Sequence, residues 1–236
     1  SRSFRGEESG FLLFSTIMYQ LFLFDFDLTL ADGSQWIVDC YQQVLQRHGF
    51  YHVSREEAKR TIGLTVEDSF HVMTGLTDQS ELQSLRDEYR SVCRPQMAAH
   101  TYLFDDARRF LCAARRAGLQ LGIVSTKQSM VIHQSLQRWE MESFFSLVYG
   151  INEVGEPKPS PMGLLRAMEQ LQVGPQQTLY FGDSVVDAQA AQRAGVGYVG
   201  VAKGVHAAAE LRAYPHVAVE DNYDNLSHLL MHVAGQ

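Results

Sequence analysis

The 236-residue sequence predicts an α/β fold, in which a parallel sheet carries helices on both faces and a helical segment is inserted after the first strand. Three observations support this prediction. An apolar, strand-like run comes early, residues 33–100 show helical patterns throughout, and strands alternate with helices from about residue 101. Such alternation, with apolar strands, is typical of parallel sheets. The chain is 45% hydrophobic and 20% charged, which suits one large soluble domain or two small ones.

The first element is the apolar strand from Leu21 to Phe24, which stops at Asp25. The apolar run begins earlier, at Phe11, and resembles a signal peptide. It is shorter than the ~20 residues of a membrane span, and no small-residue cleavage site follows it. Because the first methionine is Met18, we expect residues 1–17 to be an upstream or cloning-derived extension, and the domain to start near Met18.

The inserted segment, residues 33–100, is predicted to be all-helical. Apolar residues recur in it at helical spacing, and capping pairs or glycine mark the helix ends. The expected helices run from Trp36 to Gly49, onward from the capping pair Ser54 and Glu57, and from Asp78 and Glu81 to about Cys93.

From residue 101 onward, helices and strands alternate. Gly118 and Gly195 end two of the helices, and Ser160 followed by Pro161 is typical of a helix start. The expected helices are 105–117, 129–139, 161–171 and 185–195, and the expected strands are 119–125, 178–184 and 196–201. With the first strand they form a Rossmann-like parallel sheet. The α/β core would then comprise residues 18–32 and 101–236, and the helical domain residues 33–100.

Polar side chains follow three of these strands at the point where each strand ends. In a parallel sheet, ligands bind in the crevice beyond the carboxyl ends of the strands. Lys158 lies on a loop just before a helix and can reach the same crevice. The groups expected to meet there are Asp25 and Asp27 after the first strand, Ser125 after the second, and Asp183 and Asp187 after a later one.

The acidic residues of this crevice repel one another unless a cation or a shared proton intervenes. If the strand continues, Asp25 and Asp27 point to the same side, and two carboxylates 4 Å apart repel by about 4 kcal/mol at an effective dielectric near 20. Mg²⁺ takes oxygen ligands and is typically held by one or two carboxylates with phosphate oxygens. Asp183 or Ser184 could instead be a simple helix cap, but capping does not explain the acids, Ser125 and Lys158 together.

The net charge, the cysteines and the histidines indicate which partners, which compartment and which metal sites to expect. The net charge of −7, without a Lys/Arg cluster longer than a pair, disfavours a nucleic-acid surface or an anionic membrane, and favours a small molecule. Cys40, Cys93 and Cys112 form no C-x-x-C pair, so we expect reduced thiols and a cytoplasmic protein. His228 and His232 lack a third ligand nearby and are interpreted as the polar face of a last helix.

The stretches "DFDLT", "IVST", "KPSP" and "GDSVVD" resemble, in order and spacing, the four motifs of the haloacid dehalogenase superfamily. The resemblance covers about residues 19–32 and 101–236. The helical insert is similar to the superfamily's small cap domain, and "IGLTVEDSF" (62–70) to the cap's substrate-facing loop. The chain most resembles the phosphoglycolate phosphatase-like branch.

This resemblance implies a role for each matching residue. Asp25 corresponds to a nucleophile that forms an aspartyl phosphate, and Asp27 to the general acid and base. Ser125 and Lys158 would stabilise the phosphoryl group. Mg²⁺ would be held by the carboxylates of Asp25 and Asp183 and the backbone carbonyl of Asp27, with Asp187 in support. Candidate substrate or phosphate contacts are Thr29, Thr126 and Arg60, and in the cap Thr65, Glu67, Asp68 and His71.

The chain departs from the family pattern in three places. Leu28 stands where glycine often follows the second aspartate, and Thr126 stands where asparagine is common. The stretch "YLFDDARRF" lacks the usual proline-glycine turn before its helix, which leaves the local hinge geometry open.

These features predict a Mg²⁺-dependent phosphatase, monomeric or dimeric, that acts on a small phosphorylated metabolite such as a phosphoglycolate-like compound or a sugar phosphate. A β-phosphoglucomutase-like mutase and an inorganic pyrophosphatase remain open alternatives. Phosphonoacetaldehyde hydrolase is disfavoured because Arg60 falls near the position of the imine-forming lysine that such enzymes need. The presence of Asp27 argues against dehalogenation. The complete motif set disfavours a non-enzymatic binding protein.

Overall fold

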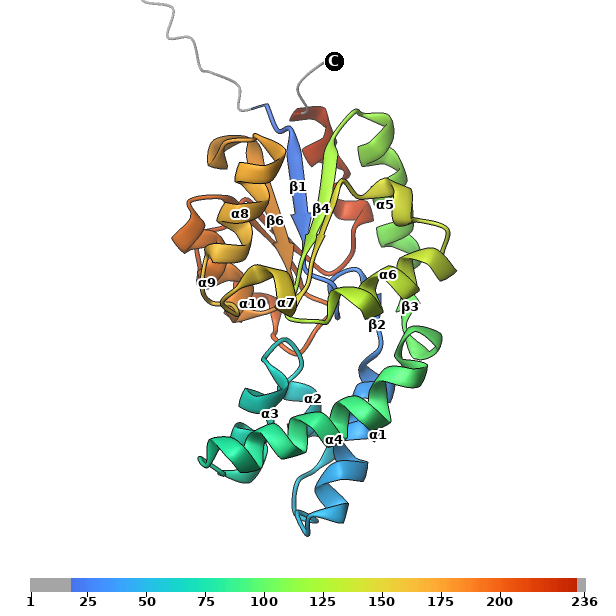
Figure 1. Ribbon diagram of the computed structural model, residues 1–236. Coiled ribbons are helices and arrows are strands. Elements are labelled where there is room, and N and C mark those ends of the chain that lie inside the picture. Colours follow the sequence, from blue (N-terminus) through green and yellow to red (C-terminus); the bar gives the residue numbers. More distant parts are fainter. Residues whose placement is uncertain (1–17, 233–236) are drawn as a thin grey trace, which may run out of the picture.

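Residues 18–232, which the computed structural model describes, contain a sheet of six parallel strands in the order β5-β4-β1-β6-β7-β8 (Figure 1). Residues 1–17, where we expected an extension, lie outside the described residues. The strands are β1 (Leu21–Phe24), β4 (Gln120–Val124), β5 (Leu147–Tyr149), β6 (Thr178–Gly182), β7 (Gly197–Val201) and β8 (Ala218–Glu220). The predicted α/β fold class is confirmed.

Strand β1 lies in the middle of the sheet, between β4 and β6. Its side chains alternate between the two faces, as strand geometry requires. Phe22 and Phe24 join one hydrophobic cluster, Leu21 and Leu23 join the other, and none of the four is exposed. Burial on both faces explains the uninterrupted apolar run, and it fixes the position of Asp25 at the strand end.

Helices cover both faces of the sheet (Figure 1). The cluster on the first face contains residues of α5 (Asp105–Arg116), α6 (Ser129–Arg138) and the 3₁₀ helix η4 (Asp224–His232). The cluster on the second face contains residues of α7 (Ile151–Val154), α8 (Met162–Leu171), α9 (Val185–Ala194) and α10 (Ala208–Leu211). Short 3₁₀ turns η2 (Glu142–Phe144) and η3 (Pro175–Gln177) precede β5 and β6. No helix within residues 18–232 combines the length and apolar character needed to cross a bilayer.

The helical segment projects from the strand ends of the sheet and has a hydrophobic cluster of its own (Figure 1). Its helices are α1 (Ser34–Arg47), α2 (Arg55–Arg60), α3 (Val66–Thr74), α4 (Gln79–Met97) and η1 (Ala98–His100). The chain enters and leaves through the antiparallel strands β2 (Ala31–Asp32) and β3 (Tyr102–Leu103). We propose the same division that the sequence predicts, with a core of residues 18–32 and 101–236 and a cap of residues 33–100.

The capping box predicted from Ser54 and Glu57 is present at the start of α2. Helix α3 was not predicted, because residues 62–70 were interpreted as a loop. Its start is marked by Thr65, whose side chain accepts a hydrogen bond from the backbone N–H of Asp68. Helix α4 continues to Met97, beyond the expected end at Cys93.

Three other predictions need correction. The N-cap residue of α8 is Pro161, not Ser160, although the Ser160 hydroxyl still accepts from the Met162 N–H at 3.3 Å. Strands β5 and β8 were not predicted, and each has only three residues, too few for a clear alternation. The last helix is a 3₁₀ helix rather than an α-helix.

Candidate active site

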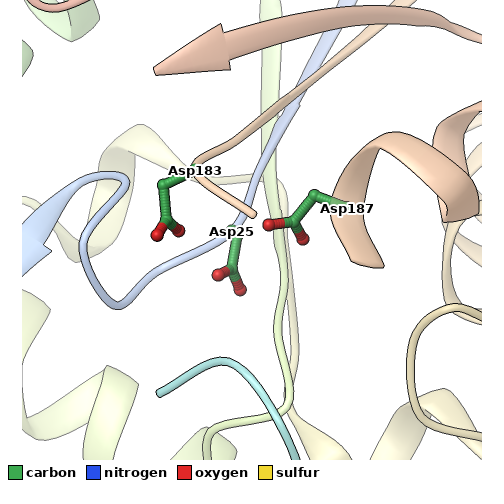
Figure 2. A group of neighbouring side chains, drawn as sticks. All are labelled: Asp25, Asp183 and Asp187. Carbon is green, nitrogen blue, oxygen red and sulfur yellow. The ribbon is translucent and has the colours of Figure 1, made fainter. Parts of the chain in front are cut away.

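Among the described residues, three buried carboxylates gather beyond the ends of β1 and β6 (Figure 2). Asp25 directly follows β1, Asp183 directly follows β6, and Asp187 lies in the first turn of α9. One oxygen from each lies within 4.8 Å of the others. Because β1 and β6 are paired in the sheet, their carboxyl ends are adjacent, which brings residues 158 positions apart in sequence together.

The clustering of these acids raises the pKa of two of them. Burial raises the pKa of Asp25 to about 6, and Asp187 adds to the rise while Lys158 and Ser125 oppose it. Burial, Asp187 and Asp25 also hold the pKa of Asp183 well above its usual range. The site therefore holds more negative charge than its surroundings compensate.

Among the described residues, Lys158 is the cation that contacts this cluster. Its Nζ lies 2.9 Å from Oδ1 of Asp25 and 2.5 Å from Oδ1 of Asp187. Burial alone would lower the pKa of this lysine, but Asp187 and Asp25 raise it instead. Lys158 is thus charged and bridges two of the three acids, as its position before α8 suggested.

The third acid, Asp183, is positioned by a neutral partner. Thr29, which is fully buried, donates a hydrogen bond from Oγ1 to Oδ1 of Asp183 at 3.0 Å. We expected Thr29 near Asp25 and phosphate, and the structure instead directs its hydroxyl to Asp183. A Cβ atom on Gly204 would overlap Oδ2 of Asp183, so the loop after β7 presses its backbone against the site.

The oxygens of Asp187 are already used within the protein. Tyr180 donates its hydroxyl to Oδ1 at 3.1 Å, and the backbone N–H of Ser184 donates to Oδ2 at 3.1 Å. In contrast, Oδ1 of Asp25 has no hydrogen-bond partner among the described residues, although it faces Lys158. Asp25 and Asp183 therefore retain ligand capacity, and oxygen donors of this kind suit a hard divalent cation. The buried cluster fits a metal site.

Asp27 lies apart from this cluster. Strand β1 ends at Phe24, so the same-side arrangement of Asp25 and Asp27 expected for a continuing strand does not form. Both carboxylate oxygens of Asp27 lie 2.8 Å from Nζ of Lys127, whose side chain is only 7% exposed. Sequence reasoning missed Lys127. Its place two residues after Ser125, at the same strand end, was a usable signal.

The residues after β4 connect the acidic cluster to the helical segment. Ser125 is buried, its side chain opposes the rise in the pKa of Asp25, and its hydroxyl oxygen accepts from the backbone N–H of Lys127 at 3.2 Å. Thr126 donates its hydroxyl to the carbonyl oxygen of Gly63, between α2 and α3, at 3.0 Å. The loop of the helical segment therefore rests directly on the strand end.

A cavity of about 410 Å³ lies between the strand ends and the helical segment. Asp27, Thr126 and Lys127 line it from the sheet side, and the α2–α3 loop and α4 line it from the other. Of the expected substrate contacts in the helical segment, Thr65, Glu67 and Asp68 line this cavity.

Two expected substrate contacts are not brought to the cavity. Arg60 does not line it: its side chain is 69% exposed, and its Nε lies 3.5 Å from Glu56 on the same helix. His71 does not line it either, and its Nδ1 lies 2.6 Å from the carbonyl oxygen of Leu76. Both residues are exposed to solvent.

Leu28, the departure from the family glycine, adopts a left-handed backbone with φ of 59°. This conformation costs a non-glycine residue about 1–2 kcal/mol. The side chain of Leu28 is nevertheless only 2% exposed and belongs to the hydrophobic cluster of the helical segment. Packing against the helices offsets the strain.

Comparisons with known proteins agree with this geometry. The model of the haloacid dehalogenase-like hydrolase family matches residues 22–201. A pyrophosphatase PpaX from Bacillus mycoides is 27% identical over 213 residues, which are 90% of this chain and 97% of that protein. A solved haloacid dehalogenase-like hydrolase from Bacteroides fragilis has a TM-score of 0.86 and 41% identity, and the match covers 88% of this chain and 99% of that one. A structure from Lactobacillus plantarum described as a phosphoglycolate phosphatase shares the fold, with a TM-score of 0.79, 22% identity and coverage of 90% and 99%.

Proposed function

The chain belongs to the haloacid dehalogenase-like hydrolase family, and on this basis we propose that it is a Mg²⁺-dependent phosphatase of a small phosphorylated metabolite. One observation carries the proposal: three buried carboxylates lie together at the ends of β1 and β6, beside Lys158. A buried acidic cluster of this kind is stabilised when a cation shares it or when a carboxyl group is protonated, and a metal ion supplies the cation at neutral pH. Such a site suits a phosphate dianion that arrives with a metal ion.

The metal ligands follow from the oxygens that the protein leaves available. The carboxylates of Asp25 and Asp183 and the backbone carbonyl of Asp27 would hold Mg²⁺. Asp187 would support the ion directly or through water, since Tyr180 and Ser184 already bond its carboxylate. When bound, Mg²⁺ supplies charge neutralisation for the phosphoryl oxygens.

Asp25 acts as the nucleophile in this proposal. One carboxylate oxygen attacks phosphorus, a bond from phosphorus to that oxygen forms, and the bond from phosphorus to the ester oxygen breaks. The ion pair with Lys158 at 2.9 Å orients the Asp25 carboxylate. Lys158 and Ser125 also face the position where phosphoryl oxygens would sit, and such preorganised donors stabilise charge in the transition state.

Asp27 transfers the protons. It donates a proton to the leaving oxygen, and the resulting carboxylate then takes a proton from the water that cleaves the aspartyl phosphate. In the structure, Lys127 holds both oxygens of Asp27 at 2.8 Å, at the edge of the cavity. Asp27 is therefore positioned on the side from which a substrate enters. We assign Thr126 to cap docking, through its bond to Gly63.

The test is hydrolysis of p-nitrophenyl phosphate with and without Mg²⁺. The expected result is turnover that requires Mg²⁺ and that Asp25→Asn abolishes. Wild-type activity no higher than that of Asp25→Asn would contradict the proposal, because the variant keeps the shape of the site but removes the nucleophile.

Inorganic pyrophosphate is a second candidate substrate. The observation in its favour is the similarity to PpaX over nearly the whole of that protein. Turnover of pyrophosphate can be compared with that of organic monoesters in the same assay, and a kcat/KM for pyrophosphate above that of every monoester tested would favour this alternative.

A further inference from the structure

Two arginines of α4, Arg90 and Arg94, line the cavity described above. They are four residues apart, so they lie on the same face of the helix, one turn from each other. The same cavity is lined at the sheet side by Asp27, Thr126 and Lys127, which follow the strand ends that carry Asp25 and Ser125. A ligand in this cavity therefore meets the proposed general acid Asp27 at one side and two guanidinium groups at the other.

Neither arginine forms an ion pair with an acid in residues 18–232. The Nε atom of Arg94 is buried, and no hydrogen-bond acceptor among the described residues reaches it. A buried donor without a partner costs about 1–3 kcal/mol, and more when the group is charged. The guanidinium group of Arg94 thus contains a hydrogen-bond donor that no residue within 18–232 satisfies.

The acids in the cavity wall are engaged elsewhere. Asp27 pairs with Lys127, and Oε1 of Glu67 lies 2.7 Å from Nη1 of Arg86, which does not line the cavity. Asp68 is exposed at the rim and accepts the Thr65 hydroxyl at 2.7 Å. Neither guanidinium group therefore has an ion-pair partner among the described residues, although burial lowers the pKa of Arg90 while the charges of Glu67 and Asp87 oppose that shift. Arginine is well suited to bind carboxylate or phosphate through two parallel hydrogen bonds.

The wall between the two charged regions is largely apolar, with Ile37, Val66 and Val131 among its residues. Pockets that hold organic ligands commonly combine such apolar walls with a few charged or polar groups. A volume of about 410 Å³ leaves room for a carbon chain, and inorganic pyrophosphate has no apolar part that would contact these side chains.

We infer that Arg90 and Arg94 form a second anion-binding subsite, and that the substrate carries a carboxylate or a second phosphate, separated from the scissile phosphate by a mainly apolar spacer. The inference rests on the proposed phosphatase activity and makes it more specific. It predicts that uncharged sugar phosphates are poor substrates, because they leave both guanidinium groups unpaired.

Three synthetic substrates with the same four-carbon chain test the subsite in the wild-type enzyme. They are n-butyl phosphate, 4-(phosphonooxy)butanoate and butane-1,4-diyl bisphosphate, which end in a methyl group, a carboxylate and a phosphate. At least one anionic compound should have a kcat/KM about tenfold or more above that of n-butyl phosphate, the effect of a charge-assisted hydrogen bond. The better anionic compound identifies the kind of second group. Equal kcat/KM for all three would overturn the inference.

Variants Arg90→Met and Arg94→Met locate the subsite. Each should reduce the preference for the anionic compound about tenfold, while kcat/KM for n-butyl phosphate and p-nitrophenyl phosphate stays within about twofold. Arg47→Met is the control: Arg47 belongs to the same helical segment and pairs with Glu88, but it does not line the cavity. An unchanged preference in both cavity variants would overturn the assignment to these arginines.

The assay separates failure of the subsite from failure of the proposed function. A protein that hydrolyses p-nitrophenyl phosphate with Mg²⁺ but shows no preference in the series lacks the subsite and retains the function. A protein inactive toward p-nitrophenyl phosphate and all three compounds contradicts the phosphatase proposal itself. The wild-type series needs no substitution, so it decides the inference even if an arginine variant does not fold.

Discussion

The hydroxyl group of Thr29 donates to Asp183 in a fully buried environment, at 3.0 Å. A hydrogen-bond partner of this kind orients a metal-binding carboxylate without contacting the metal ion itself. Thr29→Val keeps the shape of the side chain and removes the donor. We expect Mg²⁺ affinity, measured by isothermal titration calorimetry, to fall about tenfold, and the free energy of unfolding to fall by about 1 kcal/mol.

A matched control for Thr29 is Thr178, at the start of β6. Its hydroxyl donates to the carbonyl oxygen of Gly174 at 2.9 Å, at the opposite end of the strand from Asp183. Thr178→Val should cost similar stability and leave Mg²⁺ affinity unchanged. Equal Mg²⁺ affinities in the two variants would show that Thr29 does not act on the metal site.

Leu28 combines backbone strain with a buried side chain, and two substitutions separate the two effects. Leu28→Ala keeps the strain and loses the packing, so it should lower the free energy of unfolding by about 2–5 kcal/mol. Leu28→Gly also loses the packing but relieves the strain, so it should be about 1 kcal/mol more stable than the alanine variant. Urea denaturation measures both. A glycine variant less stable than the alanine variant would count against the left-handed conformation.

At the scale of elements, Asp106 ties the start of α5 to the C-terminal part of the chain. Its Oδ2 accepts from the backbone N–H of Tyr223 and from Nζ of Lys203, each at 2.9 Å. Burial alone would raise the pKa of Asp106, but the Tyr223 N–H and Lys203 lower it on balance.

The stability that Asp106 provides should depend on pH. Because its pKa is lower in the folded state than in the unfolded state, the contribution is present above the ordinary aspartate pKa of about 3.9 and is lost as the pH falls through the folded-state value. Asp106→Asn should therefore lower the melting temperature at pH 7, and the difference from wild type should narrow below about pH 4. A difference that does not change with pH would contradict this account.

The sequence predicted most of these elements because their patterns are local. The burial of β1 on both faces makes it apolar throughout, and Asp25, Ser125 and Asp183 follow directly as strand ends. Helix α3 was not predicted because residues 62–70 were interpreted as a loop from the resemblance to the family, although Val66, Phe70 and Met73 recur at helical spacing. Lys127 was not predicted because a lone lysine in a loop carries no periodic pattern, and its one signal was its place two residues after Ser125 at the end of β4.

The roles of Arg90 and Arg94 could not be predicted for a different reason. Helical periodicity identifies the buried face of α4, which includes Leu82, Leu85 and Tyr89. It does not tell whether a polar face meets solvent or a cavity beneath another part of the chain. That distinction depends on how the helical segment sits over the sheet, which is a property of the tertiary structure.

At the scale of the whole molecule, the acidic cluster links stability to pH and metal. Burial raises the pKa of Asp25 from 3.8 to about 6, and that of Asp183 also rises. Between pH 3.8 and about pH 6, Asp25 is protonated to a greater extent in the folded protein than in the unfolded chain. The metal-free protein should therefore lose stability as the pH rises through about 6. Its melting temperature in EDTA should be lower at pH 7.5 than at pH 5.

Mg²⁺ should reverse this loss, because it stabilises the ionised acids of the folded state. The rise in melting temperature on addition of Mg²⁺ should be larger at pH 7.5 than at pH 5. Asp183→Asn should show a smaller rise at pH 7.5. A wild-type rise that is equal at both pH values would indicate that Mg²⁺ does not bind the acidic cluster.

The central claim is that Asp25 becomes phosphorylated, and trapping the aspartyl phosphate tests it most directly. Asp27→Asn lacks the base for the second step, while p-nitrophenolate leaves without an acid, so the intermediate should accumulate. After an acid quench, mass spectrometry should find one phosphoryl group on the peptide that contains Asp25, in the presence of Mg²⁺ only. A phosphoryl group on another residue, or none while Mg²⁺ binding is retained, would contradict the account.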